Sequence, residues 1–263
     1  MNIVITGGSK GIGKGLAIEF SRLGHQVMIS GRDQIALDEV TKNHPRISSS
    51  ICDSTSKPQL QHLWDEAQSQ FGRVDIWINN AALARTVWSF LDTPDAEIET
   101  MVQTNILGTI NASKIAANGM LKQAKDPYRG KIVTVLGGGS DGEYFPGMAV
   151  YGTTKRALNY FTDALVHELK DEICVLKVRP GMVITEGVIR EAKANYKHFQ
   201  LTRNLANVLC DTVADVSPFL ANKIISTQHS GSKIAWLTPW KIKQRIFKAK
   251  FITPPDKFIK FGL

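Results

Sequence analysis

The chain has 263 residues, of which 43% are hydrophobic and 21% are charged. This composition excludes disordered and collagen-like proteins and predicts a globular protein with a full core. No run of about 18 apolar residues occurs, so we expect no membrane-spanning helix. Three cysteines without CxxC spacing exclude a disulfide framework and a zinc ribbon, and they favour a reducing compartment. Because Met1–Ile5 leads directly into a glycine cluster, we expect no signal peptide and a cytoplasmic location.

The net charge of +8 is concentrated at one end of the sequence. Residues 231–263 contain eight basic side chains and a single acidic one, Asp256, so this segment alone carries +7. The first 230 residues are therefore almost neutral. Because no nucleic-acid recognition motif accompanies the charge, we expect no nucleic-acid partner.

Short β-branched runs alternate with helical patterns along the chain. The runs predict strands, and apolar residues spaced three and four positions apart predict helices. In chain order we expect a strand over Asn2–Thr6, a helix over Gly11–Leu23, a strand over Gln26–Ser30, a helix over Ile35–Thr41, a strand over Ile47–Ile51, a helix over Pro58–Phe71, a strand over Val74–Ile78, a helix over Val102–Ala124, a strand over Lys131–Val135, a helix over Val150–Leu169, and strands over Ile173–Val178 and Lys233–Leu237.

This alternation predicts an α/β fold, a doubly wound parallel sheet (Rossmann fold) of about seven strands with helices on both faces. No linker rich in Pro, Gly or Ser divides the chain, so we expect a single domain over residues 1–239. Residues 240–263 are expected to form a basic amphipathic tail behind that domain.

A glycine cluster follows the first predicted strand, because residues 6–13 have the sequence TGGSKGIG. Glycines at a strand-to-helix turn let the backbone approach a pyrophosphate, and the N-terminus of the next helix offers unpaired N–H groups. The position directly after the first strand favours a dinucleotide site over a simple tight turn.

The second predicted strand ends in Gly31-Arg32-Asp33. A carboxylate at this strand end binds the ribose 2′-hydroxyl of NAD, whereas a guanidinium suits the 2′-phosphate of NADP. Arg32 together with Lys10 therefore favours NADP(H) as the cofactor. The alternative is that Asp33 binds the ribose hydroxyls.

Tyr151 and Lys155 lie four residues apart on a predicted helix, and therefore on one face of it. A free tyrosine has a pKa near 10, and a nearby cation lowers this pKa by stabilising the phenolate. The pair is a candidate acid–base unit, although the same spacing is common on amphipathic helices.

Five motifs in register resemble those of one family. They are residues 6–13, Asn79-Asn80-Ala81, Asn105, Tyr151-x-x-x-Lys155 and Pro180-Gly181-x-x-x-Thr185. Their order and spacing over residues 2–190 resemble the short-chain dehydrogenase/reductase family. The resemblance implies an NADP(H)-dependent oxidoreductase that reduces an aldehyde or ketone to an alcohol and forms a homodimer or homotetramer.

The same resemblance assigns roles to individual residues. Tyr151 would protonate the carbonyl oxygen as hydride arrives from the nicotinamide, and Lys155 would hold the nicotinamide ribose and lower the phenol pKa. Asn105 would anchor a water molecule that relays protons to the lysine, and Asp53 is similar to the acid that contacts adenine. The other residues expected at the cofactor are Gly7, Ser9, Lys10, Gly11, Ile12, Gly13, Arg32, Asn79, Ala81, Pro180, Gly181, Val183 and Thr185.

The chain departs from the family pattern at two places. Ala82 replaces the glycine that usually follows Asn-Asn-Ala, and Gly138 stands where the substrate-orienting serine is expected. The nearest hydroxyl belongs to Ser140, and we expect the glycine loop to bring it to the carbonyl, where it would stabilise the developing oxyanion. The alternative is that a backbone N–H of residues 137–139 polarises the carbonyl.

The glycine loop also resembles one branch of the family. This loop, residues 75–81, 180–186 and 231–239 are similar to chlorophyll(ide) b reductases, which reduce a formyl group to a hydroxymethyl group with NADPH. Reduction of a 3-oxoacyl thioester or another aliphatic ketone is the alternative. A non-catalytic NADP(H)-binding sensor or scaffold is the alternative of another class, and the presence of Tyr151 and Lys155 argues against it.

Two further segments and the histidines complete the predictions. Residues 186–204 occupy the place of a substrate lid. A basic amphipathic pattern over residues 240–251 can lie on an anionic bilayer or dock onto the body or a second subunit, and docking is slightly favoured.

The histidines, His198 among them, show no metal-ligand spacing, so we expect no metal site. The aromatic side chains that either line the lid pocket or simply pack are Trp88, Tyr144, Phe145, Tyr196 and Phe199.

Overall fold

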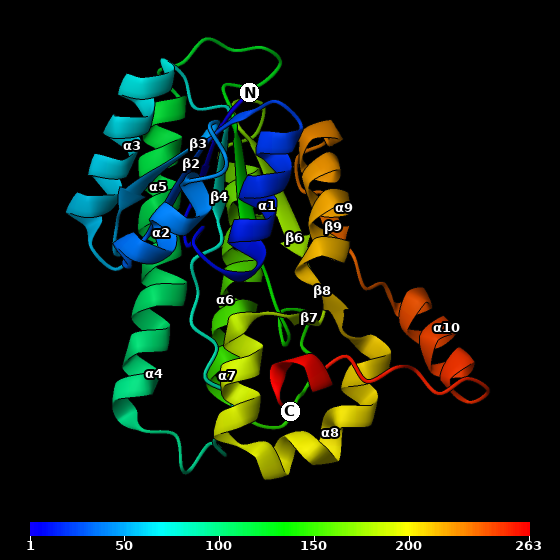
Figure 1. Cartoon of the computed structure of the whole chain (residues 1–263). Helices are drawn as coiled ribbons and strands as arrows, with labels where there is room; N and C mark the ends of the chain where they lie inside the picture. The colour runs from blue at the N-terminus through cyan, green and yellow to red at the C-terminus, as the bar shows by residue number, and fades with distance from the viewer.

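The structure, a computed structural model, describes residues 1–263 apart from the side chain of His198, so the expectation about the histidines lies partly outside the described residues. Seven parallel strands form one sheet in the order β3-β2-β1-β4-β5-β6-β9 (Figure 1). The order reverses between β1 and β4, the kind of switch point at which α/β sheets bind ligands. The strands are β1 (Asn2–Ile5), β2 (Gln26–Gly31), β3 (Ile47–Ile51), β4 (Ile76–Asn79), β5 (Lys131–Val135), β6 (Cys174–Arg179) and β9 (Lys233–Ala235).

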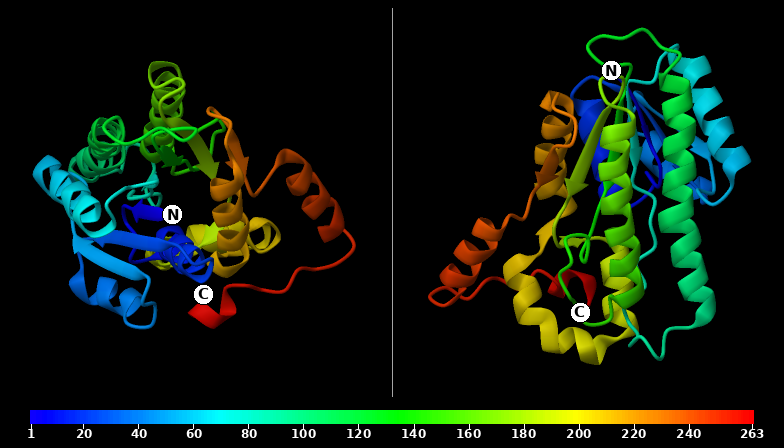
Figure 2. Two further views of the ribbon diagram at one scale, coloured as in Figure 1. Left: turned by 90° about the horizontal axis from the view of Figure 1, so that it is seen from above. Right: turned by 180° about the vertical axis from the view of Figure 1, so that it is seen from behind.

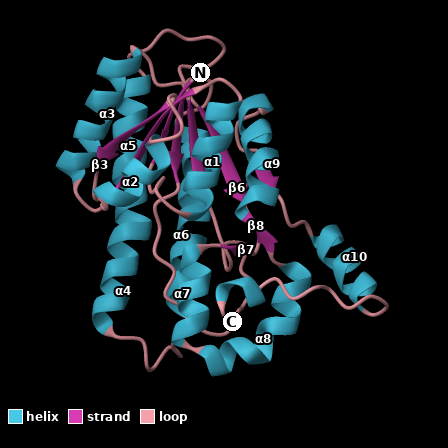
Figure 3. Cartoon of the chain, viewed as in Figure 1, coloured by secondary structure: helices cyan, strands magenta, loops and turns pink.

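Helices cover both faces of this sheet (Figures 2 and 3). On one face lie α1 (Gly11–Arg22), α2 (Gln34–Thr41) and α9 (Val213–Ser226), and on the other lie α3 (Lys57–Phe71), α5 (Thr109–Met120) and α6 (Ala149–Glu168). Successive strand residues point to opposite faces. Ile3 and Ile5 accordingly pack with α1 and α9, while Val4 packs with α3 and α5. The predicted doubly wound α/β fold is confirmed.

Among the predicted elements, the long helix over Val102–Ala124 is wrong in its bounds and its kind. The structure has α4 (Asp95–Met101), a π-helical stretch η1 (Val102–Gly108) and then α5. The apolar spacing used for the prediction describes only α-helical turns, so it cannot register the π-helical segment. The other predicted elements agree within two residues at each end.

A smaller unit lies at the carboxyl ends of the strands. It consists of a two-stranded sheet, β7 (Val183–Ile184) and β8 (Asp211–Thr212), with α7 (Glu186–Ala194) and α8 (Tyr196–Leu209). The C-terminal segment leaves the sheet through α10 (Pro239–Ala249) and returns to α7 and α8 through the short helix η2 (Ile259–Phe261), as Figure 1 shows. Phe258 and Leu263 are buried there in a separate apolar cluster with Phe199. The end of the tail therefore packs into this smaller unit, which contains residues 186–204 of the expected lid.

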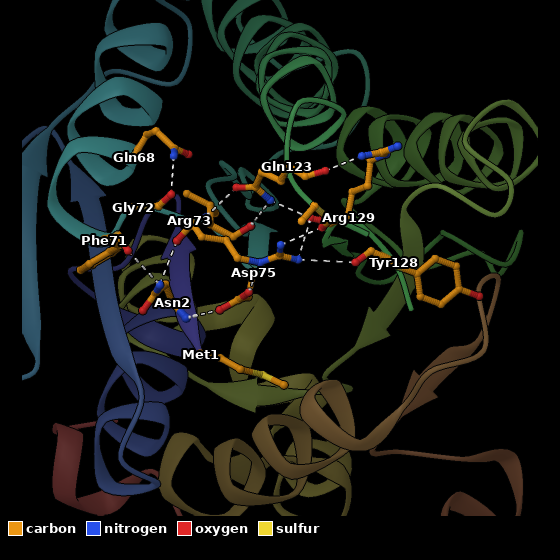
Figure 4. Close-up of polar contacts among 12 residues, drawn as sticks. Met1, Asn2, Gln68, Phe71, Gly72, Arg73, Asp75, Gln123, Tyr128 and Arg129 are labelled. Atoms are coloured by element: carbon orange, nitrogen blue, oxygen red, sulfur yellow. Dashed lines mark hydrogen bonds and ion pairs between the residues drawn. The ribbon is translucent and has the colours of Figure 1, made fainter. Parts of the chain in front are cut away.

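The amino ends of the strands are held together by a polar network (Figure 4). The backbone N–H of Asn2 donates to Asp75 Oδ2 at 2.8 Å, and Arg73 Nε donates to Asp75 Oδ1 at 2.7 Å. Arg73 Nη1 also donates to the carbonyl of Ala124 at 2.8 Å, and Gln123 Oε1 accepts from the backbone of Val74. This edge is closed by protein contacts, which leaves the opposite edge for a site.

None of the helices that the structure describes is both long enough and apolar enough to cross a bilayer. The cytoplasmic location stays a prediction.

Candidate active site

The glycine loop between β1 and α1 is braced by the Asn-Asn-Ala motif after β4. Gly7 has a φ of +66°, and a Cβ at this position would lie 2.8 Å from Ala81 Cα. Thr6 Oγ1 accepts from the backbone N–H groups of Asn80 and Ala81, both at 3.1 Å. Asn80 Nδ2 donates to the carbonyls of Thr6 and Gly7 at 3.1 and 2.9 Å. Asn80 was part of the predicted motif without a role of its own, and it holds the loop in shape.

The N-terminus of α1 faces the start of α7. The backbone N–H of Gly11 donates to Glu186 Oε2 at 2.9 Å, and a Cβ at Gly11 would lie 3.3 Å from Thr185 Cγ2. Thr185 Oγ1 accepts from the backbone of Val188 and caps α7. A carboxylate is stabilised at a helix N-terminus, as a phosphate would be. The role of Glu186 was not predicted, although its position directly after the Pro-Gly…Thr motif is a usable signal.

Two cations lie where β2 ends. Asp33 Oδ1 caps α2 by accepting from the backbone of Ala36 at 3.1 Å, and Asp33 Oδ2 lies 3.7 Å from Lys10 Nζ. Arg32 Nη1 lies 3.9 Å from Asp53 Oδ2, too far for a strong hydrogen bond, and the Arg32 side chain is mostly exposed. Because the Asp33 carboxylate is engaged as a helix cap, Arg32 and Lys10 are the groups available to a ligand phosphate.

The carboxyl group after β3 is held in its charged form. Burial raises the pKa of Asp53. Hydrogen bonds from the backbone and hydroxyl of Thr55, together with the charge of Arg32, lower the pKa by more than burial raises it, so the pKa lies below its ordinary value. Asp53 can therefore accept hydrogen bonds at neutral pH.

The other predicted cofactor residues lie on the same edge of the sheet with unequal exposure. Ser9 Oγ is 3.2 Å from the position of a Cβ at Gly31, so the glycine loop touches the end of β2. Asn79 is buried. Its Oδ1 accepts from Trp77 Nε1 and its Nδ2 donates to Ser113 Oγ, both at 2.9 Å. A contact between Asn79 and the adenosine ribose remains a prediction. The residues that the structure also places at this edge are Ile12, Gly13, Pro180, Gly181 and Val183.

Tyr151 and Lys155 both lie on α6, at the carboxyl end of β5. Lys155 is buried, its Nζ donates to the carbonyl of Val135 at 3.0 Å, and Nζ lies 5.7 Å from the centroid of the Tyr151 ring. Burial lowers the pKa of Lys155 to about 8 and raises the pKa of Tyr151 to about 12. Burial favours the neutral form of both groups, and the expectation that Lys155 lowers the phenol pKa stays a prediction.

Asn105 connects the π-helical stretch to α6. Its Oδ1 accepts from the backbone of Leu83 at 2.7 Å, and its Nδ2 donates to the carbonyl of Leu83 and to Thr154 Oγ1 at 2.9 and 3.0 Å. Thr154 Oγ1 in turn donates to the carbonyl of Tyr151 at 2.7 Å. Asn105 is completely buried. It thus fixes the turn of α6 that carries Tyr151 and Lys155, and the part of Thr154 in this chain was not predicted.

The loop after β5 places glycines, rather than Ser140, against the tyrosine. A Cβ at Gly137 would lie 2.3 Å from the Tyr151 hydroxyl, and a Cβ at Gly139, whose φ is +85°, would lie 2.6 Å from Gly152 Cα. Ser140 is completely buried, and its Oγ has no hydrogen-bond partner among the described residues. Its carbonyl accepts from Asn159 Nδ2 at 2.9 Å. The contact between Ser140 and a substrate stays a prediction.

Charged side chains fasten the outer part of the same loop. Arg179 Nη1 lies 2.5 Å from Asp141 Oδ2, and Arg179 also pairs with Glu143. Lys233 on β9 forms a further ion pair with Asp141. These ion pairs tie the outer part of the loop to β6 and β9. Residues 137–139 are glycines and have no side chains that could form such contacts.

The aromatic side chains expected around the lid lie in three kinds of surroundings. Phe199 is buried and packs edge-on against Phe258, with ring centroids 4.9 Å apart, so packing explains it. Phe145 lies near the catalytic loop, because a Cβ at Gly138 would be 3.5 Å from its ring. Tyr144 and Tyr196 are exposed.

Comparison with known proteins agrees with this geometry. Residues 1–195 match the family model described as short chain dehydrogenase. The chlorophyll(ide) b reductase NOL, chloroplastic, of Arabidopsis thaliana is 32% identical over 262 residues, which cover 94% of this chain and 72% of that protein. The probable chlorophyll(ide) b reductase NYC1, chloroplastic, of Oryza sativa subsp. japonica is 29% identical over 263 residues, which cover 92% of this chain and 50% of that protein. The chain thus spans about half the length of that relative.

A solved structure, ElxO with NADP bound, aligns with a TM-score of 0.75 at 25% identity, covering 89% of this chain and 96% of that chain. An actinorhodin polyketide ketoreductase structure shares the fold, with a TM-score of 0.79 at 22% identity over 89% of this chain and 95% of that chain. The matching model, which spans the glycine loop, Asn105, Tyr151 and Lys155, shows the family. The chain belongs to the short-chain dehydrogenases.

Proposed function

We propose that this protein is an NADPH-dependent reductase that converts an aldehyde or ketone to an alcohol. The observation that carries the proposal is the arrangement on α6, where Tyr151 and the buried Lys155 share one helix turn that Asn105 fixes through Thr154. Acid–base catalysis requires a proton donor held in one geometry, and this chain of hydrogen bonds provides it.

The residues at the switch point fit NADP(H). The positive φ of Gly7 and the close approach of its backbone to Ala81 leave a cradle without side chains, and the Gly11 N–H already binds a carboxylate oxygen. Arg32 and Lys10 suit a 2′-phosphate, in agreement with the NADP named in the ElxO structure. When bound, NADPH supplies the hydride, and the protein supplies orientation and the proton.

In the proposed reaction, the carbonyl carbon receives the hydride and the carbonyl oxygen receives the phenolic proton of Tyr151. Because burial raises the pKa of Tyr151 to about 12, the phenol keeps its proton at neutral pH until the oxygen becomes basic. Lys155 and the water expected at Asn105 would then return a proton to the phenolate. For the oxyanion we keep Ser140 as the proposed donor and a backbone N–H of residues 137–139 as the alternative.

For the substrate we propose a formyl group of the chlorophyll(ide) b type, since relatives that match more than nine tenths of this chain carry that name. The alternative is a 3-oxoacyl thioester or another aliphatic ketone, and the glycine at position 138, where the serine is expected, argues mildly against it. A homodimer or homotetramer remains a prediction.

The test is NADPH oxidation against a panel that contains chlorophyllide b, a 3-oxoacyl thioester and simple aldehydes, with Tyr151→Phe beside the wild type. We expect turnover of one class and a loss of roughly 10²- to 10⁴-fold in the variant, with NADPH binding retained. Tyr160→Phe is the matched control, because Tyr160 lies on the same helix and is exposed. Tight NADPH binding without turnover of any panel member would favour the sensor or scaffold.

A further inference from the structure

Helix α10 touches the rest of the protein through one side only. It stands beside α8 at the edge of the molecule (Figures 1 and 2), and none of its residues is buried. Arg245 donates to the carbonyl of Leu209 and to Asp211 Oδ1, both at 3.0 Å, and Lys241 Nζ lies 3.1 Å from the centroid of the Trp236 ring. These contacts define the side of α10 that faces the body.

Aromatic side chains form a stripe on the other side of this helix. Trp240 and Phe247 are seven residues apart on α10, which brings them onto one side of the helix, and Phe251 follows in the turn just after it. Their exposed fractions are 68%, 64% and 74%. The rings of Phe247 and Phe251 pack edge-on with centroids 5.2 Å apart. Three large rings that face outward cost hydration free energy unless something covers them.

Lysines flank this aromatic stripe on both sides. At about 100° per residue, Lys243 and Lys250 fall on one side of the stripe and Lys248 falls on the other. Within the described part of the chain, none of these three lysines has an ion pair. The nearby acids are already engaged, because Asp211 pairs with Arg245 at 2.8 Å and Asp256 pairs with Arg203 at 2.6 Å. The positive charge around the stripe is therefore uncompensated.

We propose that the stripe of Trp240, Phe247 and Phe251 with its flanking lysines is a docking surface for an anionic lipid bilayer. Aromatic rings enter the boundary between headgroups and acyl chains, and lysines beside them reach the anionic headgroups. A second copy of this chain is a poorer partner, because two such surfaces would bring like charges together.

A groove next to the stripe extends the apolar surface onto the lid. It lies between α8 and α10 and has a volume of about 430 Å³. Leu205 and Val208 line it from α8, and Ile246 and Ala249 line it from α10. Leu201, one turn before Leu205, is also exposed. Docking through α10 therefore brings α8, which belongs to the lid, close to the bilayer, but the docking itself does not depend on the proposed reaction.

The test is co-sedimentation of the full chain with vesicles of phosphatidylcholine, with and without phosphatidylserine. We expect binding only to the anionic vesicles, and weaker binding as the salt concentration rises. The variant with Lys243, Lys248 and Lys250 replaced by Gln should partition on the order of 100-fold more weakly, at about a factor of five per lysine. The variant Phe247→Ser with Phe251→Ser should also lose binding.

Matched controls separate this surface from general charge and hydrophobicity. Lys114 on α5, Lys122 just after α5 and Lys42 just after α2 are exposed. Their joint replacement by Gln removes the same charge but should leave binding unchanged. Tyr160→Ser removes an exposed ring elsewhere and should also bind as the wild type does. Circular dichroism and NADPH affinity equal to the wild type show that each variant is folded.

Two outcomes would overturn the proposal. The first is a wild type that does not prefer anionic vesicles, or stripe variants that bind as tightly as the controls. The second is self-association in sedimentation velocity that the Phe variant abolishes, without vesicle binding, which would assign the stripe to a second copy.

In a further measurement, Trp240→Phe should keep vesicle binding but lose most of the blue shift in tryptophan emission. An undiminished shift would contradict the placement of Trp240 in the bilayer.

Discussion

Replacing Lys155 by Met tests the cost of the buried ammonium group directly. Lys155 Nζ is enclosed between β5 and α6, with the carbonyl of Val135 as its recorded hydrogen-bond acceptor. Met is of similar length and carries no charge, so the variant removes the ammonium group and leaves the packing nearly unchanged. The quantity to compare is the free energy of unfolding of the two proteins as a function of pH, without cofactor.

The structure gives both the sign and the size of the effect. Burial lowers the pKa of Lys155 from 10.5 to about 8, so between these values the unfolded chain binds more protons than the folded one. The contribution of Lys155 to stability is therefore unfavourable below pH 8 and disappears as the pH approaches 10.5. At about 1.4 kcal/mol per pKa unit, the penalty at neutral pH is about 3 kcal/mol. Loss of the hydrogen bond to Val135 costs about 1 kcal/mol at every pH, so the variant should be more stable by about 2 kcal/mol at neutral pH.

Urea unfolding at several pH values measures this difference. We expect the advantage of Lys155→Met to shrink by at least about 2 kcal/mol between neutral pH and pH 10. Other groups titrate in this range, since burial raises the pKa values of Cys52, Cys174 and Cys210 to about 11, but they are common to both proteins and cancel in the difference. Lys170→Met, at an exposed position, is the control and should show a constant difference. A constant difference for Lys155→Met as well would refute the argument.

Three further changes probe the cofactor cradle and the catalytic loop. Arg32→Gln should weaken NADPH binding by roughly 10- to 100-fold and NADH binding far less in fluorescence titrations, and equal losses would contradict a contact with the 2′-phosphate. Glu186→Gln should tighten NADPH binding by about 2- to 5-fold, because a carboxylate no longer competes for the Gly11 N–H, and an unchanged affinity would contradict that competition. Gly139→Ala should lower the free energy of unfolding by about 1–3 kcal/mol more than Gly142→Ala does. Both glycines have a positive φ, but only at Gly139 would the added methyl group meet neighbouring atoms. Equal losses would show that backbone strain alone, without the contact with Gly152, explains the effect.

The central strands of the sheet were predictable from the sequence because they are buried on both faces. Lys131–Val135, buried throughout, forms a strand with the predicted bounds, since a parallel strand under helices is a short, mostly apolar run. The edge strand Ile47–Ile51 also has the predicted bounds, although it is only partly buried. The π-helical stretch Val102–Gly108 was not predictable, because no apolar spacing distinguishes it from the α-helix on either side. The burial of Phe258 in the lid was not predictable either, because it depends on contacts with α7 and α8, far away in the sequence.

The candidate site was predictable where one element supplies the geometry. The spacing of Tyr151 and Lys155 on α6 needs no tertiary information. The roles of Asn80 and Glu186 were not predicted because each acts through a hydrogen bond to a segment distant in the sequence, Gly7 for the first and Gly11 for the second. The orientation of Ser140 was open for a different reason, since a run of three glycines places few steric limits on the direction of the chain that follows.

The two edges of the sheet satisfy their polar groups to different degrees. At the amino edge, Arg73 and Asp75 are paired with each other and with the surrounding backbone (Figure 4). At the carboxyl edge, the described residues include Thr134 and Ser140, whose buried hydroxyls have no partner, and Lys155, whose charge is opposed by burial. Unpaired buried groups destabilise the fold and concentrate where a bound ligand or a reaction uses them. Part of the free energy that the chain gives up therefore lies at the edge where the glycine loop and α6 meet, as expected if the cofactor and the carbonyl bind there.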